Sequence, residues 1–247
     1  MTQTRILMVL LFLSFCSLAP GAPGLTLQQV VDRCTEAAGG KAAIEAARAI
    51  QVKLTIEEPK FKVEGVYLAD RKLRMRIDIY ADQKRVYTEA YDGTKGWQMG
   101  EDGVHSDSKP EGSAALLHGI LTPGKLFGLH EQESIGNHLE LAGREIVDKV
   151  NYYVLELTLK DGFVIQYYVN PDTWLIERSR DERALHPDID PTKKATESRF
   201  SDYRKVDDVL RSFETTTVDL NTGFVSTDTV LEVNINPKLD ESRFQKP

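Results

Sequence analysis

The sequence predicts an α+β protein that is mainly antiparallel β-sheet, and three observations carry this prediction. A helical pattern of apolar residues runs from Leu25 to Ala49. After Ile50 the period changes to two, and apolar and polar residues alternate in about 11 to 12 short stretches. The turns between these stretches contain Gly, Asn, Asp or Pro, as tight antiparallel connections require.

The N-terminal helical pattern divides into two helices. Thr26 and Gln29 have the spacing of a capping box, and Gly39-Gly40 is a typical helix end. A second, shorter helix is expected over Lys41–Ala49. The apolar faces comprise Leu27, Val30, Val31, Cys34 and Ala38 in the first helix, and Ile44 and Ala47 in the second.

The clearest strand is KLRMRIDI, residues 72–79, in which apolar and charged residues alternate. Such a strand has one dry face and one wet face. We expect Leu73, Met75, Ile77 and Ile79 on the dry face and Lys72, Arg74, Arg76 and Asp78 on the wet face. The other expected strands are 51–58, 61–69, 84–91, 96–100, 138–147, 150–160, 162–170, 173–182, 195–205, 210–219 and 224–236.

A sheet of this width, curled toward a barrel, is too broad for its own side chains to fill. Roughly eight strands already leave a lumen that side chains just fill. For each dry face an ordinary core is the simpler interpretation, but their combined area favours a cavity. Two neighbouring strands contribute Tyr153, Leu155, Leu157 and Leu159, and Ile165, Tyr167 and Val169. An outer-membrane barrel needs an apolar outward face, which the charged face of 72–79 argues against.

Two segments interrupt the strands. Residues 104–135 contain SAALLHGILTPGKLFGL, an apolar helical pattern broken at Pro123-Gly124. Such short apolar pieces need another surface to cover them, so we expect either a movable lid or a permanently packed plug. Residues 184–194 form a polar loop.

Residues 1–24 have the pattern of a secretory signal peptide. Arg5 precedes the apolar run Ile6–Phe15, and a cleavage zone follows near residues 19–24. Lipid attachment at Cys16 is the alternative, but the bulky Phe15 disfavours it. We therefore expect export and one mature domain, residues 25–247.

No catalytic constellation is visible in the sequence. Cys34 lies on an apolar helix face, which indicates a buried structural thiol. The histidines lack the spacing of metal ligands: they are His105, His118, His130, His138 and His186. The formal net charge of −7 disfavours nucleic-acid binding. We expect no enzyme activity, no metal and no cofactor.

Four stretches together resemble the LolA-like outer-membrane lipoprotein-sorting superfamily. They are EAAGGKAAIEAARAIQVKLTIE, YDGTKGWQM, YYVLELTLKDGFVIQYYVNPDTWLIERSR and SDYRKVDD, spread in order over nearly the whole of residues 25–247. The resemblance implies an unclosed, strongly curved antiparallel β-barrel with an N-terminal helix. A helical lid, here about 104–135, would cover a hydrophobic cavity that binds acyl chains without a cofactor.

The chain departs from that family in two places. Lipoprotein carriers of the family often have Arg-Pro before the strand that corresponds to 72–79, with the arginine tying down the lid. Ala69-Asp70 stands there instead, and Arg71 is a nearby substitute. After SDYRKVDD many relatives continue with Gly and then Phe-Pro, where this chain has VLRSFETTT. These departures indicate a divergent branch.

The resemblance and the dry faces together predict a periplasmic carrier of the acyl chains of a lipid or lipoprotein. Inner- or outer-membrane transport components would be its partners. The alternative is a lipid- or lipoprotein-sensing regulatory protein that acts through a partner. The expected ligand-binding residues are Leu54, Ile56, Val63, Leu73, Met75, Ile77, Trp97, Met99, Leu116, Leu117, Ile120, Leu121, Leu155, Leu157 and Tyr167.

Overall fold

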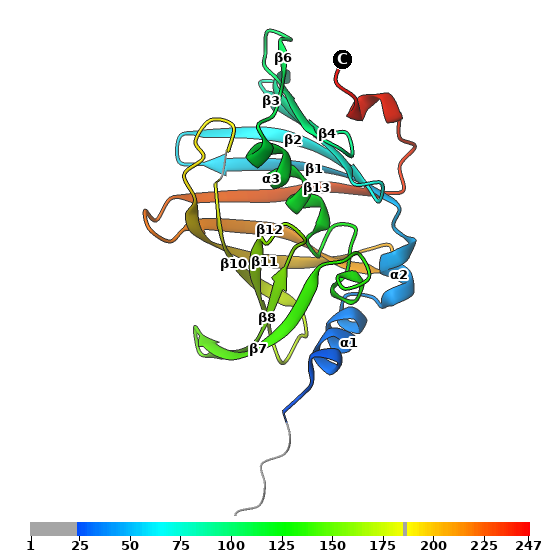
Figure 1. The fold of residues 1–247 in the computed structure, drawn as a ribbon, viewed down its shortest axis with the longest axis vertical. Coiled ribbons are helices and arrows are strands. Elements are labelled where there is room, and N and C mark those ends of the chain that lie inside the picture. Colours follow the sequence, from blue (N-terminus) through cyan, green and yellow to red (C-terminus); the bar gives the residue numbers. More distant parts are fainter. Residues whose placement is uncertain (1–23, 185–186) are drawn as a thin grey trace, which may run out of the picture.

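A computed structural model describes residues 24–184 and 187–247, which form a single curled antiparallel sheet of 13 strands with helices on its concave side (Figure 1). The predicted fold class is confirmed. The predicted signal peptide lies, through residue 23, outside the described residues. No helix in the described ranges is both long and apolar enough to cross a membrane.

The structure sets the bounds of each element. The helices are α1 (Leu27–Ala37), α2 (Lys41–Ala46) and α3 (Pro110–Leu121), with short 3-10 turns η1 (Leu129–Glu131) and η2 (Glu241–Phe244). The strands are β1 (Ala49–Glu58), β2 (Phe61–Asp70), β3 (Arg74–Ala81), β4 (Lys84–Tyr91), β5 (Gly96–Met99), β6 (His105–Asp107), β7 (His138–Val147), β8 (Val150–Thr158), β9 (Val164–Val169), β10 (Ile176–Arg183), β11 (Lys194–Val206), β12 (Val209–Asp219) and β13 (Val225–Ile235). The strand that sequence reasoning missed is β6, inside the expected lid segment.

The sheet consists of two meanders joined in the middle. Its order is β6-β5-β4-β3-β2-β1-β13-β12-β11-β10-β9-β8-β7, so β1 pairs with β13 and the two edges, β6 and β7, do not pair with each other. The barrel is therefore unclosed. Figure 1 shows α3 lying across the concave face, with α1 and α2 at one end.

Helix α1 begins where the sequence predicts. The Thr26 hydroxyl accepts a hydrogen bond from the Gln29 amide at 3.3 Å, and the Gln29 side chain accepts one from the Thr26 amide at 2.9 Å. Beyond its end, Gly39 has φ 123, and a Cβ on this residue would lie 2.1 Å from the Asp208 carbonyl oxygen. Helix α2 ends at Ala46, shorter than predicted, because Ala49 already pairs with Asp70 in the sheet.

Two apolar clusters occupy the concave side. The α1 cluster joins α1 to β7–β9 and contains Val30, Val31, Cys34, Leu129, Leu139, Leu155, Leu157, Leu159, Ile165, Tyr167 and Val169. The α3 cluster joins α3 to β1–β4 and contains Ala47, Ile50, Val52, Tyr67, Ala69, Met75, Tyr91, Ile120, Leu126 and Phe127. Both clusters recruit partly buried residues of α3, since Leu121 packs on the first and Leu116 and Leu117 on the second.

The predicted wet face of 72–79 is wrong for most of its residues. Arg74 and Asp78 are only 8% and 2% exposed, because the C-terminal turn η2 covers this outer face. Arg74 pairs with Asp70 at 2.5 Å and with Glu241 at 3.0 Å. A segment 167 residues away in sequence thus buries charges that the local pattern assigns to solvent.

Candidate ligand-binding interior

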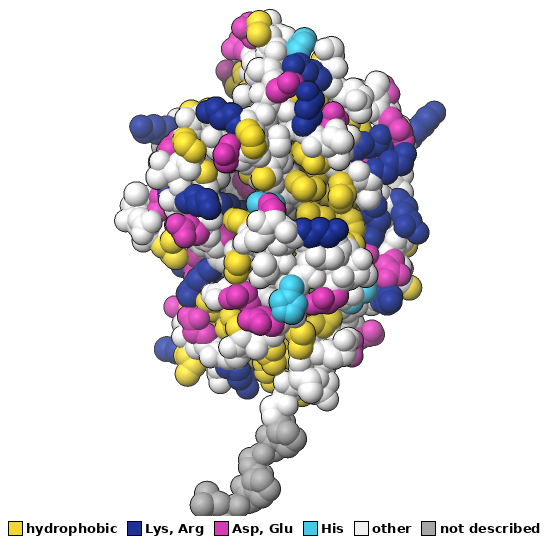
Figure 2. Space-filling view, in the orientation of Figure 1, with side chains coloured by type: hydrophobic (Ala, Val, Ile, Leu, Met, Phe, Trp, Pro, Cys, Tyr) yellow, Lys and Arg dark blue, Asp and Glu magenta, His cyan; other side chains and the backbone are white. Residues whose placement is uncertain are grey.

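Helix α3 lies between the two apolar clusters and is half-buried along most of its length. Of its apolar residues only Ile120 is fully buried, at 1% exposure. An apolar helix needs cover on several sides, and the concave sheet supplies it. Figure 2 shows hydrophobic side chains gathered in the middle of this face, near the position of α3.

Side-chain contacts near the protein surface hold α3 in place. Its N-terminal Lys109 amide donates to Asp188 Oδ1 at 2.6 Å, and the Ser113 hydroxyl accepts from the Gly96 amide at 2.9 Å. His118 Nε2 lies 2.6 Å from Asp161 Oδ2. Burial of Asp161 opposes ionisation, but the hydrogen bond and charge of His118, together with the hydrogen bond from the Phe163 amide, lower the pKa of Asp161 overall. These contacts are individually weak where their partners meet water.

The segment that follows α3 is held much more firmly. We call residues 123–131 the clasped segment. The Arg71 guanidinium donates to the Leu126 carbonyl at 2.6 Å and to Glu131 at 2.5 Å, and its carbon lies 4.8 Å from the centre of the Phe127 ring. It also donates to the carbonyls of Ile44 and Ala47 at the end of α2. Arg71 therefore ties α2 to the clasped segment.

A second buried arginine holds the other end of this segment. Arg211 on β12 is 6% exposed and donates from Nη1 to the carbonyl oxygens of Gly124, at 3.1 Å, and Lys125. Burial lowers the pKa of Arg211 to about 10, so the side chain stays charged at neutral pH. Chain bending at Pro123-Gly124 thus separates α3 from a segment fixed by two arginines.

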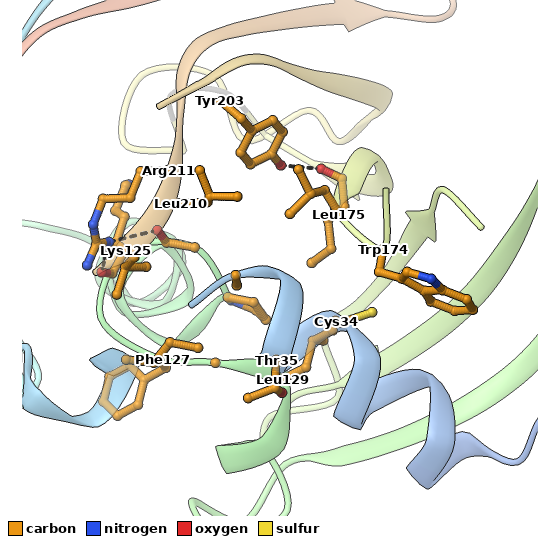
Figure 3. Close-up of a pocket in the computed structure, with 17 residues that line it drawn as sticks. Cys34, Thr35, Lys125, Phe127, Leu129, Trp174, Leu175, Tyr203, Leu210 and Arg211 are labelled. Atoms are coloured by element: carbon orange, nitrogen blue, oxygen red, sulfur yellow. Dashed lines mark hydrogen bonds between the residues drawn. The ribbon is translucent and has the colours of Figure 1, made fainter. Parts of the chain in front are cut away.

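A pocket lies between α1, the clasped segment and the β11–β12 hairpin (Figure 3). Its cavity volume is ≈ 90 Å³, which holds several waters but is smaller than the roughly 300 to 1,000 Å³ of pockets for drug-sized ligands. The lining residues are Cys34, Thr35, Ala38, Ile44, Pro123, Gly124, Lys125, Phe127, Gly128, Leu129, Trp174, Leu175, Ile176, Tyr203, Val209, Leu210 and Arg211. None of the predicted ligand-binding residues, all of which are described, lines it.

The predicted ligand-binding residues fall into four groups. Leu54, Leu73, Met75, Ile77, Leu116, Leu117 and Ile120 belong to the α3 cluster, and Leu121, Leu155, Leu157 and Tyr167 to the α1 cluster. Ile56 and Val63 are half-buried cross-strand neighbours outside both clusters. Trp97 and Met99 lie elsewhere.

Trp97 and Met99 lie on the outer face of the sheet, outside both apolar clusters. Trp97 is 0% exposed, and its Nε1 donates to the Phe244 carbonyl at 2.8 Å under the C-terminal turn η2. Strand pairing places Met99 on the same outer face. Asp92 lies in the turn between β4 and β5, where its side chain accepts hydrogen bonds from the Thr94 and Lys95 amides at 2.8 and 2.9 Å.

One acidic cluster has donor atoms close enough for a metal. Atoms of Glu45, His130 and Glu131 lie within 4.8 Å of one another. However, both Glu131 oxygens already accept hydrogen bonds, from Arg71 and from the Gly128 amide. The arginine supplies the positive charge there, so the cluster works as part of the clasp.

The fold matches solved structures at low sequence identity. A LolA superfamily protein from Nitrosomonas europaea aligns with a TM-score of 0.59 and 16% identity, covering 90% of this chain and 99% of that one. A DUF1329 family protein from Desulfovibrio piger aligns with a TM-score of 0.59 and 12% identity, covering 89% of this chain and 97% of that one. An outer membrane lipoprotein-sorting protein domain from Vibrio parahaemolyticus aligns with a TM-score of 0.54 and 9% identity, covering 88% of this chain and 96% of that one. No family model and no curated protein matches the sequence.

Proposed function

We propose that this chain, which has the fold of the LolA superfamily, is a periplasmic carrier that binds the acyl chains of a lipid or lipoprotein on its concave face. The observation that carries the proposal is the packing of α3. Leu116, Leu117 and Ile120 cover an apolar sheet surface that an acyl chain could equally cover. The small volume of the present pocket fits a closed form.

The expected binding mode is competition between α3 and the ligand. An acyl chain gains burial on the same strands that α3 now covers, so binding shifts the population toward an open form. The hydrogen bonds to be broken are those of Lys109, Ser113 and His118 and the one that Gln132 donates to the Leu121 carbonyl. The clasp at Arg71 and Arg211 can stay intact. The carrier thus needs no rearrangement of the sheet.

Variants of α3 test the proposal. Protein is purified from envelopes without detergent, and mass spectrometry identifies any co-purified lipid. In a binding assay with a fluorescent fatty-acyl probe, Leu117→Glu should change the affinity about tenfold while far-UV circular dichroism stays unchanged. The matched control is Leu231→Glu, at a position 57% exposed on β13. Absence of acyl ligand in both experiments would contradict the carrier proposal.

A further inference from the structure

The concave face is not apolar throughout. Across β10–β13 it carries a band of polar side chains, which we call the polar stripe: Ser179, Asp181, Arg183, Thr196, Ser198, Thr215, Thr217 and Asp228. Strand pairing puts these residues on the same face as Tyr167 and Ile56. The polar stripe therefore separates the α1 cluster from the α3 cluster inside the barrel.

Part of the polar stripe satisfies itself. Thr196 donates to Asp181 at 2.9 Å, and Arg183 Nη2 donates to the Ser198 hydroxyl at 3.0 Å while its Nε lies 3.2 Å from Asp181. Thr196 and Ser198 are only 1% and 4% exposed. Buried polar groups on a carrier's inner wall cost stability unless they are paired, and this half of the stripe is paired.

Two groups outside the polar stripe, the Tyr67 hydroxyl and the Lys125 ammonium, form no hydrogen bond among the described residues. The hydroxyl of Tyr67, a residue 6% exposed on β2, has no hydrogen-bond partner among the described residues. Lys125 is exposed as a residue, but its ammonium lies 4.4 Å from the centre of the Tyr67 ring. The charges of Lys125 and Arg183 both act on Asp228. Lys125 and the Tyr67 hydroxyl thus lie together, and Asp228 lies near Lys125 and near Arg183, which also pairs with Asp181.

Asp228 would oppose an anion here only when ionised. Burial, with the charge of Glu58, raises its pKa to about 6, and Lys125 and Arg183 only partly offset this rise, so Asp228 is neutral below about pH 6 and ionised above it. Its cross-strand neighbours are Ile56 on β1 and Thr215 on β12, and Ile56 pairs onward with Val63. Ile56 and Val63 lie outside both apolar clusters and are half-buried. The polar groups therefore lie next to an apolar surface that no cluster covers.

We propose that this interior site binds the anionic headgroup, a carboxylate or a phosphate, of an acyl amphiphile. Lys125 and Arg183 neutralise the charge, the Tyr67 hydroxyl donates a hydrogen bond to it, and the chain lies on the adjoining apolar wall. Charge-assisted hydrogen bonds of this kind are among the strong ones in proteins. The inference rests on the proposed function, because it names the ligand class for the same interior.

Three probes with the same chain separate the possibilities. Oleate carries a carboxylate, oleoyl lysophosphatidate a phosphate, and oleyl alcohol no charge. In equilibrium binding to the full chain, one or both anionic probes should bind at least about tenfold more tightly than the alcohol. Preference for one anion identifies the source of the headgroup.

Two variants locate the effect. Lys125→Met and Tyr67→Phe should each weaken binding of the preferred anion by about three- to tenfold or more, and change oleyl alcohol binding less than about twofold. Tyr67→Phe should not lower the urea midpoint of the free protein, because the hydroxyl it removes has no partner. Lys238→Met, at an exposed position, is the matched control.

The outcomes are distinct. Equal binding of all three probes, unchanged in both variants, would overturn the headgroup site and leave the carrier proposal standing. Binding of none of the probes would overturn both. Loss of anion binding in Lys238→Met to the same degree as in Lys125→Met would show a general charge effect and would also overturn the site.

Discussion

Replacement of Arg71 by Met tests the clasp most directly. The substitution keeps an unbranched apolar stem of similar reach and removes the guanidinium. Three carbonyl oxygens then lose the hydrogen bond from Arg71, those of Ile44, Ala47 and Leu126; the Ile44 carbonyl keeps a hydrogen bond from the Ala47 amide. Glu131 is left without its cation, although the Gly128 amide still donates to it at 2.8 Å.

The expected destabilisation follows from burial. The side chains of Arg71 and Glu131 are only 15% and 10% exposed. Removing one partner of a buried ion pair costs about 3 to 5 kcal/mol, because the other charge stays buried and unpaired. Since total stabilities are about 5 to 15 kcal/mol, this is a large share. Arg71→Lys keeps the charge but not the planar fork, so its cost should be smaller.

The effect should depend on pH in a defined direction. Burial raises the pKa of Glu131, but the hydrogen bond and charge of Arg71, the hydrogen bond from the Gly128 amide and the charge of His130 together lower the pKa overall. A carboxylate with a depressed folded pKa contributes stability above its unfolded pKa, about 4.3, and this is lost as the pH falls through the folded pKa. The difference between wild type and Arg71→Met should therefore shrink below about pH 4.

Urea unfolding at pH 7 measures the difference. Arg204→Met is the matched control, because Arg204 pairs with Asp202 at the surface with 57% and 44% exposure, and such pairs contribute about 0 to 1 kcal/mol. If Arg71→Met cost no more than Arg204→Met, or if its cost grew at acid pH, the clasp would not have the energetic role assigned to it.

Three further predictions concern other parts of the chain. Phe244→Ala removes a side chain that is 0% exposed and should lower the free energy of unfolding by about 3 to 5 kcal/mol. It should also shift the fluorescence of Trp97 to longer wavelength. Unchanged emission would show that η2 does not cover Trp97. The pKa of Asp228 in the folded state is raised to about 6, so its contribution to stability is largest below about pH 4 and is lost as the pH rises through 6. Asp228→Asn should therefore remove the corresponding fall of the urea midpoint between pH 4 and 7. If the midpoints of wild type and variant fell in parallel with pH, the assignment would be refuted. Gly39→Ala places a Cβ 2.1 Å from the Asp208 carbonyl at φ 123, and a loss of less than about 1 kcal/mol would contradict the close packing of α1 on the β11–β12 turn.

Local pattern predicted the elements well because strands and turns are local. The period of two located nearly every strand, and the Thr26 capping box located the start of α1. Which face of a strand is dry depends on distant segments. The charged face of β3 is buried by η2, and no local signal in 72–79 contains that information.

The polar stripe escaped prediction for a related reason. In β11 and β12 the alternation of Thr, Ser and charged residues has no clear apolar face, so periodicity does not say which side faces inward. The positions become meaningful only through pairing, as when Ser198 lies beside both Ser179 and Thr217. Arg71, by contrast, was identified from sequence as a substitute for the missing Arg-Pro, although its carbonyl partners were not.

Under the carrier function proposed above, the difference in how the two halves of 110–131 are held determines how the interior opens. Arg71 and Arg211 each hold the clasped segment through more than one hydrogen bond, whereas single side-chain hydrogen bonds, such as that of His118, hold α3. Opening therefore separates α3 at the interruption formed by Pro123 and Gly124, which has φ 118. Exposing Leu117 and Ile120 costs up to about 1.5 to 3 kcal/mol for each side chain. Opening exposes two apolar surfaces, that of the sheet and that of α3. An acyl chain bound to the sheet covers the first but not the second. The open form should therefore be populated mainly when α3 packs on a new apolar surface, in the ligand itself or in a receiving partner.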